Sequence, residues 1–542
     1  MIVRRGLLML LLVLSPLAAQ KQSPIPLQLD IKEKQLEELY AEYWRAEYNI
    51  ARGDEYLTSR PVQERIRMVM SDEKFLHDLK LTRLEGPSLR RRRDLFLEEA
   101  AYTKISNDPA LTALVESITR DENSFRYKVG DRQLTRAALT DLVAHSSDPG
   151  LRRQAWEARA QITAINGERI RDAMKLRNKL ALENADELFS VFMSRRKGFE
   201  TEELFEWFDE IRSQTETEYQ ALIKRMGREL RVDTVEPWDL EFYFSAFTND
   251  FEQQRFVPEQ GWTVTKKLAA SLGYNLERLP VEMQVADLSF PGAAYPIVYG
   301  KEVKILANRY SGIFFFDRLL HATGHALHYS MMNEPSFLLR NNYAEPFDEG
   351  LAQVIALRLY HPEVGTELFG LTREQAELVA EISRWKTLFE IRRTMADSLF
   401  EFEGYAEPNQ DLAALYNRIH TEYLGVDMHG TPVWAYNPMY GSDPIYLQSY
   451  VVGDIVAHQI SHTIDREFGA RWDYKAGVYL KKYFYSRGAE QTMDEIMQSG
   501  TGEPLTVRYL IDYLIRMNRR GITLNKTRSC LVSQQHAANS DR

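Results

Sequence analysis

Two histidines, His321 and His325, stand four residues apart in the segment from Asp317 to Tyr329. This segment has a strongly helical pattern, so the spacing places both imidazoles on one face, a turn apart, where they can share one zinc ion. Glu349 follows 24 residues after His325, at the expected start of another helix. Two histidines and one glutamate leave a fourth coordination position for water, which is the arrangement of a catalytic Zn²⁺ site.

The histidine segment reads His-Ala-Thr-Gly-His-Ala-Leu-His from residue 321 to 328, and a glutamate follows about a helix later. This pattern resembles the active-site helix of the gluzincin peptidases, in particular the thimet-oligopeptidase and oligopeptidase F families and their relative, the angiotensin-converting-enzyme family. Two further segments are similar to oligopeptidase signatures: Lys175–Ala181 and Val235–Leu240. The His325-to-Glu349 spacing and the stretch from Gly488 to Tyr513 look more like the converting-enzyme branch.

The resemblance covers about residues 30–520 and implies a mainly α fold. Such a fold is a large, two-lobed helical body with a deep central channel. One domain of the catalytic type is expected over residues 20–525, with lobes that are not contiguous in the sequence. The channel would admit a short peptide or another small ligand.

One position departs from the family motif, which is His-Glu-x-x-His. The second residue of the motif is Ala322 in this chain. In the family, that glutamate is the general base that takes a proton from the zinc-bound water and passes it to the leaving amine. General base catalysis contributes ~10²–10⁴-fold, and alanine has no group that can supply it. We therefore expect metal binding to survive and ordinary peptide hydrolysis to be severely reduced or absent.

Three other carboxylates lie close in sequence to the ligands: Asp317, Glu345 and Asp348. Each is a candidate for a relocated base, although a supporting partner of the ligands, a helix cap or a surface charge is the simpler reading. In the converting-enzyme family, an aspartate four residues after the glutamate ligand orients a histidine. That position is Gln353 here, whose amide oxygen can accept the same hydrogen bond without a charge.

Tyrosines of a later segment complete the site in these families, because a tyrosine and a histidine there stabilise the oxyanion. Tyr450 matches the family tyrosine, and Tyr446, one turn earlier, is the alternative. Either residue also suits the lining of a channel. The family histidine has no clear counterpart, since the nearest one upstream is His429.

The remaining histidines near these segments favour structural roles. His328 extends the zinc-helix face, where a hydrogen-bonded core histidine is the expected role. His458 and His462 form another pair four residues apart. No acidic third ligand is evident on their helix face, so a packed or solvated face is favoured over a second metal site.

Most of the chain has helical periodicity, and strand-like runs are few. Tyr295–Tyr299 and Val303–Ala307 flank Gly300, which predicts a small β-hairpin just before the zinc helix. Capping boxes are predicted at Asp30 with Glu33 and at Thr372 with Gln375. The expected helices are 30–51, 63–81, 88–105, 152–183, 202–231, 258–272, 448–468 and 477–485, with a further one that continues through Trp385.

Composition and the N-terminal sequence bound the class of protein. The chain of 542 residues has a formal net charge of −10, which argues against nucleic-acid binding, and Cys530 is its only cysteine. Residues 1–19 have the pattern of a secretory signal peptide. Its removal takes away Arg4 and Arg5 and leaves a charge of −12, with a periplasmic or extracellular location and no membrane anchor. Residues 526–542 form a polar tail.

The sequence thus favours a secreted zinc-binding protein on a metallopeptidase scaffold, which has lost ordinary peptidase activity and binds a short peptide or another small ligand. The alternative is an active zinc hydrolase with a relocated base. A structural protein with neither metal nor substrate is less favoured, because all three ligands are present.

Overall fold

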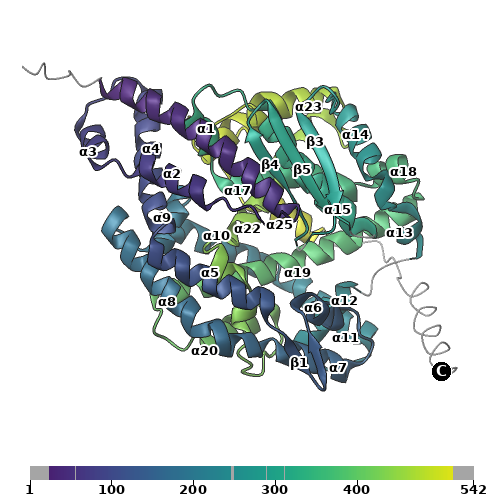
Figure 1. Cartoon of the computed structure of the whole chain (residues 1–542). Helices are drawn as coiled ribbons and strands as arrows, with labels where there is room; N and C mark the ends of the chain where they lie inside the picture. Colours follow the sequence, from purple (N-terminus) through teal and green to yellow (C-terminus); the bar gives the residue numbers. More distant parts are fainter. Residues whose placement is uncertain (1–23, 55, 246–249, 289, 310–311, 517–542) are drawn as a thin grey trace, which may run out of the picture.

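A computed structural model describes residues 24–54, 56–245, 250–288, 290–309 and 312–516 (Figure 1). The described chain is mainly helical with two small sheets, so the predicted fold class is confirmed. The predicted signal peptide and polar tail lie outside the described residues. No described helix combines the length and apolar composition that crossing a membrane requires.

The first half of the chain forms helices that precede the main sheet. Their bounds are α1 (Ile25–Ala51), α2 (Arg60–Met70), α3 (Glu73–Leu81), α4 (Pro87–Ser106), α5 (Pro109–Ser124), α6 (Arg136–His145), α7 (Pro149–Ala158), α8 (Ala160–Ala185), α9 (Phe189–Arg196), α10 (Thr201–Gln214), α11 (Glu216–Leu230), α12 (Pro237–Ser245), α13 (Asp250–Arg255) and α14 (Gly261–Ser271). A two-stranded hairpin, β1 (Tyr127–Val129) with β2 (Arg132–Leu134), lies between α5 and α6.

The second half carries the predicted zinc ligands. Its helices are α15 (Gly312–Met331), α16 (Phe337–Asn341), α17 (Glu345–Leu357), α18 (Pro362–Phe369), α19 (Arg373–Ala406), α20 (Leu412–Leu424), α21 (Met439–Ser442), α22 (Gln448–Phe468), α23 (Tyr474–Leu480), α24 (Met493–Thr501) and α25 (Arg508–Ile515). A short helical turn, η2 (Arg358–Tyr360), follows α17.

Several predicted helices are interrupted where a local group ends them. The helix expected over 63–81 is two helices, because the side chain of Asp72 accepts a hydrogen bond from the backbone of Phe75 and starts α3 there. The prediction of a cap at Asp30 was wrong, since α1 begins at Ile25 and Asp30 pairs with Arg92 instead. The capping box of Thr372 and Gln375 is confirmed at the start of α19.

The main sheet has the strand order β3-β5-β4, from β3 (Val281–Ala286), β4 (Gly292–Val298) and β5 (Glu302–Asn308). The antiparallel pair β4–β5 confirms the predicted hairpin. Strand β3, parallel to β5, was not predicted, although apolar Val281, Met283 and Val285 alternate with polar residues as a half-buried strand requires. Helix α15 packs on this sheet, and α1 crosses it (Figure 1).

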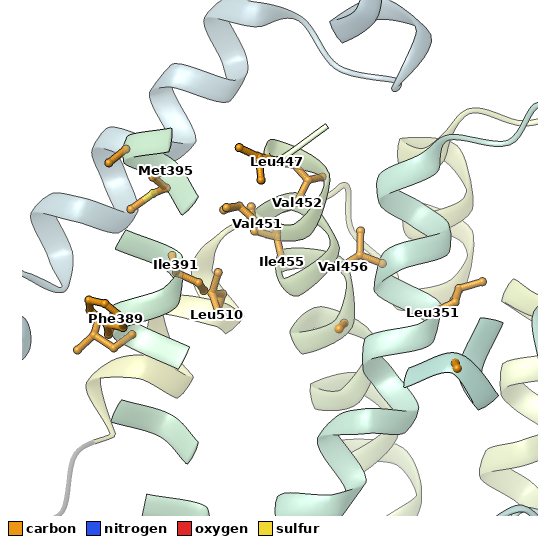
Figure 2. Close-up of a cluster of buried hydrophobic side chains, with 14 of the residues drawn as sticks. Leu351, Phe389, Ile391, Met395, Leu447, Val451, Val452, Ile455, Val456 and Leu510 are labelled. Atoms are coloured by element: carbon orange, nitrogen blue, oxygen red, sulfur yellow. The ribbon is translucent and has the colours of Figure 1, made fainter. Parts of the chain in front are cut away.

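Helices α15, α17 and α22 pack unusually closely because glycines lie at their contacts. A Cβ on Gly324 of α15 would be 2.5 Å from the Cα of Ala352 on α17. A Cβ on Gly453 of α22 would be 2.9 Å from the Cβ of Glu349. Apolar residues of α22, among them Val452 and Val456, fill the core between α17 and α19 (Figure 2). The three helices that carry the predicted site therefore form one rigid, buried unit.

Candidate metal centre

His321, His325 and Glu349 converge where α15 meets α17. The Oε2 atom of Glu349 lies 3.2 Å from Nε2 of His321 and 3.9 Å from Nε2 of His325. One ligand atom from each residue lies within 4.8 Å of the other two, and within the described residues this is the group of histidines and acids that can hold a metal ion. The close approach at Gly324 makes the cluster possible, because a larger residue would push α17 away.

Asp348 supports His325 through a hydrogen bond to Nδ1, the ring nitrogen that does not point toward Glu349. Its Oδ2 atom lies 2.8 Å from Nδ1 of His325 and accepts the hydroxyl of Tyr329 at 2.7 Å, while Oδ1 lies 2.6 Å from Nδ1 of His328. Burial opposes protonation of His325, but the charge of Asp348 outweighs it and raises the pKa of His325 to about 9. Burial also opposes ionisation of Asp348, yet the two histidines hold the pKa of this carboxyl well below its usual range.

Gln353 supports His321 as the sequence predicts. Its Oε1 atom lies 3.3 Å from Nδ1 of His321, so the uncharged amide takes the place of a carboxylate. Burial raises the pKa of Asp454 on α22 to about 7, and the nearby amide of Gln353 partly offsets this effect. Sequence reasoning did not single out Asp454, although it stands one helical turn after Tyr450. The hydrogen-bonded support of His321 is therefore the amide of Gln353 on α17, with the carboxyl of Asp454 on α22 close to it.

The donor set fits a zinc ion. Each ligand histidine uses Nδ1 for a supporting partner, which leaves Nε2 directed toward Glu349. Two imidazole nitrogens and one carboxylate are a ligand set that zinc accepts, and such supporting hydrogen bonds fix the tautomer that binds metal. His328 lies outside this set, because it is fully buried and bonded to Asp348, as expected of a core histidine.

The three carboxylates considered as substitutes for a base all have partners. Ala322 itself is 3% exposed. Asp317 accepts from Nε of Arg318 at 2.7 Å and from the hydroxyl of Tyr360 at 2.9 Å, and in the described part of the chain it forms no hydrogen bond or ion pair with the ligands. Glu345 is paired with Lys197 at 2.5 Å and with the hydroxyl of Ser449 at 2.6 Å. Asp348 is held by the two histidines and Tyr329.

The two predicted tyrosines differ in their surroundings. The hydroxyl of Tyr446 donates to Oε1 of Glu349 at 2.5 Å, so Tyr446 contacts a ligand directly. Tyr450, whose ring is 5.3 Å from that of Tyr446, is 41% exposed and has the freer hydroxyl. His429 does not join them, because its Nε2 atom lies 2.6 Å from Glu236 and its ring stacks on Trp238.

A buried acid holds the loop that precedes these tyrosines. Glu401 accepts from the backbone N–H of Ile445 at 2.8 Å, at a residue with a left-handed φ of 54°. Burial raises the pKa of Glu401 to about 8, from the usual 4.5. The folded state thus binds one more proton than the unfolded state between pH 4.5 and 8, and this contribution to stability is lost as pH rises through that window.

We predict that Glu401→Gln flattens this pH dependence. The amide oxygen can still accept from Ile445, but it does not ionise, so at pH 9 the variant should be more stable than the wild type by up to about 5 kcal/mol, given about 1.4 kcal/mol per pKa unit. Urea denaturation at pH 5 and pH 9 measures the difference. Glu403→Gln, at a half-exposed site on the same helix, is the control that should not change the slope.

Comparisons with known proteins agree on a metallocarboxypeptidase fold. No protein-family model matches the chain. The structure is similar to the M32 carboxypeptidase from Deinococcus radiodurans R1, with a TM-score of 0.60 and 14% identity over 90% of this chain and 98% of the other. It is equally similar to metallocarboxypeptidase 1 of Trypanosoma cruzi, with a TM-score of 0.61 and 12% identity over 90% and 99%.

A comparison of sequences also finds a relative that is named a carboxypeptidase. The chain is 30% identical over 142 residues to carboxypeptidase 1 of Bacillus subtilis (strain 168), which covers 23% of this chain and 26% of the relative. The match thus spans about a quarter of that relative's length. The chain has the fold of the M32 carboxypeptidases, with a histidine, histidine and glutamate cluster at its centre. The finer resemblance to the oligopeptidase families stays a prediction.

Proposed function

We propose that the protein binds zinc and peptides on a metallocarboxypeptidase scaffold and has little or no ordinary peptidase activity. The observation that carries this proposal is Ala322. The three ligands and their supports are intact, whereas the position next to His321 has no proton acceptor and each neighbouring carboxylate is already paired. Zinc, when bound, would polarise a peptide carbonyl and acidify a bound water.

The residues around the cluster support peptides as the ligand class. Tyr446 and Tyr450 offer hydroxyls that can donate to a carbonyl oxygen. Lys197 lies 4.6 Å from the ring centre of Tyr446. Burial raises the pKa of Tyr450, against the charge of Arg318, which lowers it. Lys197 and Arg318 are already paired with Glu345 and Asp317. The freer hydroxyl of Tyr450 is therefore the donor that suits the carboxyl end of a peptide, which is also the end that the names of the similar proteins indicate.

An active hydrolase is the second candidate, and Glu345 is the observation that favours it. Its side chain is 36% exposed and stands one turn before Glu349 on α17. Its charge reaches both Tyr446 and Tyr450. Release from Lys197 would leave a solvent-facing carboxylate near the tyrosines, where it can act as a general base.

One set of measurements separates these functions. Zinc is measured by elemental analysis of the purified protein, peptide binding by calorimetry with and without a chelator, and cleavage by chromatography of a panel of short peptides. About one zinc per chain, zinc-dependent binding and no cleavage would support the first proposal. Chelator-sensitive cleavage that Glu345→Gln abolishes would support the second. A protein that stays free of zinc when metal is supplied would contradict both.

We predict that Asp348→Asn weakens zinc binding by ~10–100-fold, as loss of a supporting partner does at other zinc sites. The asparagine amide is nearly the same size but removes the negative charge that orients His325. Its oxygen can accept a hydrogen bond from one histidine, but its NH2 group can only donate to the other. Competition with a fluorescent chelator measures the affinity. An unchanged affinity would show that His325 does not depend on Asp348 for its orientation. Glu363→Gln, whose acid pairs with His361 outside the cluster, is the matched control.

We also propose that the protein is exported, and residues 1–19 support this. Two arginines, a short apolar run and a small-residue end are the elements of a secretory signal. Expression of the whole chain followed by cell fractionation and N-terminal sequencing tests the proposal. A mature N-terminus at Gln20 outside the cytoplasm is expected, and an uncleaved cytoplasmic chain would contradict it.

A further inference from the structure

A cavity of about 510 Å³ lies beyond the metal cluster, among η2, α19, α22 and α25. None of the three ligands lines it. Two features connect its wall to the surroundings of the cluster. Tyr360 of the wall donates a hydrogen bond to Asp317, and His458 of the wall lies one helical turn after Asp454 on α22. The cavity is therefore distinct from the metal centre but shares helix α22 with it.

Two arginines in the wall have no carboxylate partner among the described residues. Arg358 is 6% exposed, donates to the carbonyl of Ala470 at 3.0 Å, and stacks over Trp472 at 4.3 Å. Burial lowers the pKa of Arg358 to about 10. Arg384 donates to the carbonyl of Arg516 at 3.0 Å, while its buried Nε has no partner among the described residues. A buried cation without an ion-pair partner is costly, which favours an anion at Arg358, and the half-buried Arg384 of the same wall can add a second charged donor.

Within the described residues, no acid of the wall forms a direct ion pair with Arg358 or Arg384. Asp465 accepts from the indole N–H of Trp472 at 2.7 Å, and Glu377 is paired with Arg373 at 2.8 Å. Glu381 also has a partner of its own. Asp465 keeps its charge and favours the charged form of Arg358, against the burial that lowers the pKa of this guanidinium. Burial, and then the charges of Arg384 and Arg516, lower the pKa of His458 to about 3.

Two further polar atoms of wall residues have no hydrogen-bond partner within the described part of the chain. His458 is 6% exposed, and its Nε2 atom has no partner among the described residues. The hydroxyl of Ser461, one turn along α22, is buried and equally without a partner there. Both atoms lie just behind the cavity surface, where a small side-chain rotation would bring them to a ligand or an ordered water, and such unpartnered buried atoms are uncommon in native proteins.

Aromatic rings complete the cavity. Trp472, Tyr509 and Tyr513 all line it, and Tyr513 lies with its ring centre 4.3 Å from that of His458. These rings give flat apolar surfaces beside the cationic wall. Guanidinium groups bind carboxylates and phosphates through paired hydrogen bonds, and aromatic rings pack against a planar body.

We propose that this cavity is a binding site for a small organic anion, in which Arg358 and Arg384 bind a carboxylate or phosphate group and the aromatic wall holds a planar apolar body. His458 and Ser461 add hydrogen bonds to the same group. The proposal is independent of zinc and of peptide binding, since no residue in it belongs to the metal centre.

Isothermal titration calorimetry of the full chain tests this proposal with three probes: benzoate, phenyl phosphate and neutral benzamide. We expect one or both anions to bind about tenfold more tightly than benzamide or better, because hydrogen bonds to charged groups are the strong ones. Tighter binding of phenyl phosphate would assign a phosphate ester, and tighter binding of benzoate a carboxylate. Equal binding of all three probes, or of none, would overturn the proposal.

Two variants locate the site. Arg358→Gln and Arg384→Gln should each weaken anion binding by about tenfold or more, without changing zinc content. Because Arg358 is buried and its loss can unfold the chain, the half-buried Arg384 provides the second test, and circular dichroism checks both folds. Arg153→Gln, which removes a surface arginine paired with Glu157 on α7, is the matched control. Wild-type anion affinity in a folded Arg384→Gln variant would contradict the assignment.

Discussion

Ala322→Glu is expected to raise cleavage of short peptides by ~10²-fold or more over the wild type, because general base catalysis typically contributes 10²–10⁴-fold. The new carboxylate would follow His321 directly on α15, where the related motif carries its base. His321, His325 and Glu349 already have their supports, so the substitution adds the one missing group to a prepared site. The rate of product release from a peptide panel, with and without a chelator, measures the effect.

The matched control for this experiment is Ala322→Gln, which has the size of glutamate but accepts no proton at neutral pH. Position 322 is almost completely buried, so both variants test whether the core tolerates a longer side chain. Cleavage by the glutamate variant alone would support a scaffold that lacks only its base. Equal cleavage by wild type and Ala322→Glu would contradict the first proposed function and direct attention to Glu345.

The cluster of His321, His325 and Glu349 could be predicted because the types of these residues and their spacing in the sequence match a known zinc-binding pattern. A pair of histidines four apart on a helical segment has one geometric outcome, and the glutamate at 349 completes a recognisable set. Gln353 as the partner of His321 also followed from position, since it stands one turn after Glu349 on the same helix. The spacing of the two histidines follows the period of α15 and that of Glu349 and Gln353 the period of α17, whereas the meeting of the two helices was expected from the resemblance to the peptidase motif.

Contacts between distant helices could not be predicted in the same way. The link from Gln353 to Asp454 joins α17 to α22, and the pairing of Lys197 with Glu345 joins α9 and the turn after it to α17. The first depends on how closely α17 and α22 pack, which Gly453 allows because a Cβ there would lie 2.9 Å from the Cβ of Glu349. A single sequence shows that glycine but not the side chain it approaches. Arg358 and Arg384 could not be predicted as neighbours either, because they lie on η2 and α19 and only the folded structure brings both to one cavity.

Glu349→Gln is expected to abolish stoichiometric zinc binding, with a larger effect than the ~10–100-fold that loss of a supporting partner causes. The substitution removes the negative charge of the ligand set while keeping the shape that packs against Gly453. The amide oxygen can still accept the hydroxyl of Tyr446, so the fold should persist. Elemental analysis of protein purified with added zinc measures the occupancy.

Thermal unfolding gives a second readout of the same loss. A ligand that binds only the folded state stabilises it by about 2.7 kcal/mol at one hundred times its Kd, so added zinc should raise the Tm of the wild type but not of Glu349→Gln. Glu345→Gln, one turn earlier on α17, is the matched control and should retain the zinc-dependent shift whether or not Glu345 acts as a base. Equal shifts in wild type and Glu349→Gln would mean that zinc binds elsewhere, and the cluster on α15 and α17 would then have another role.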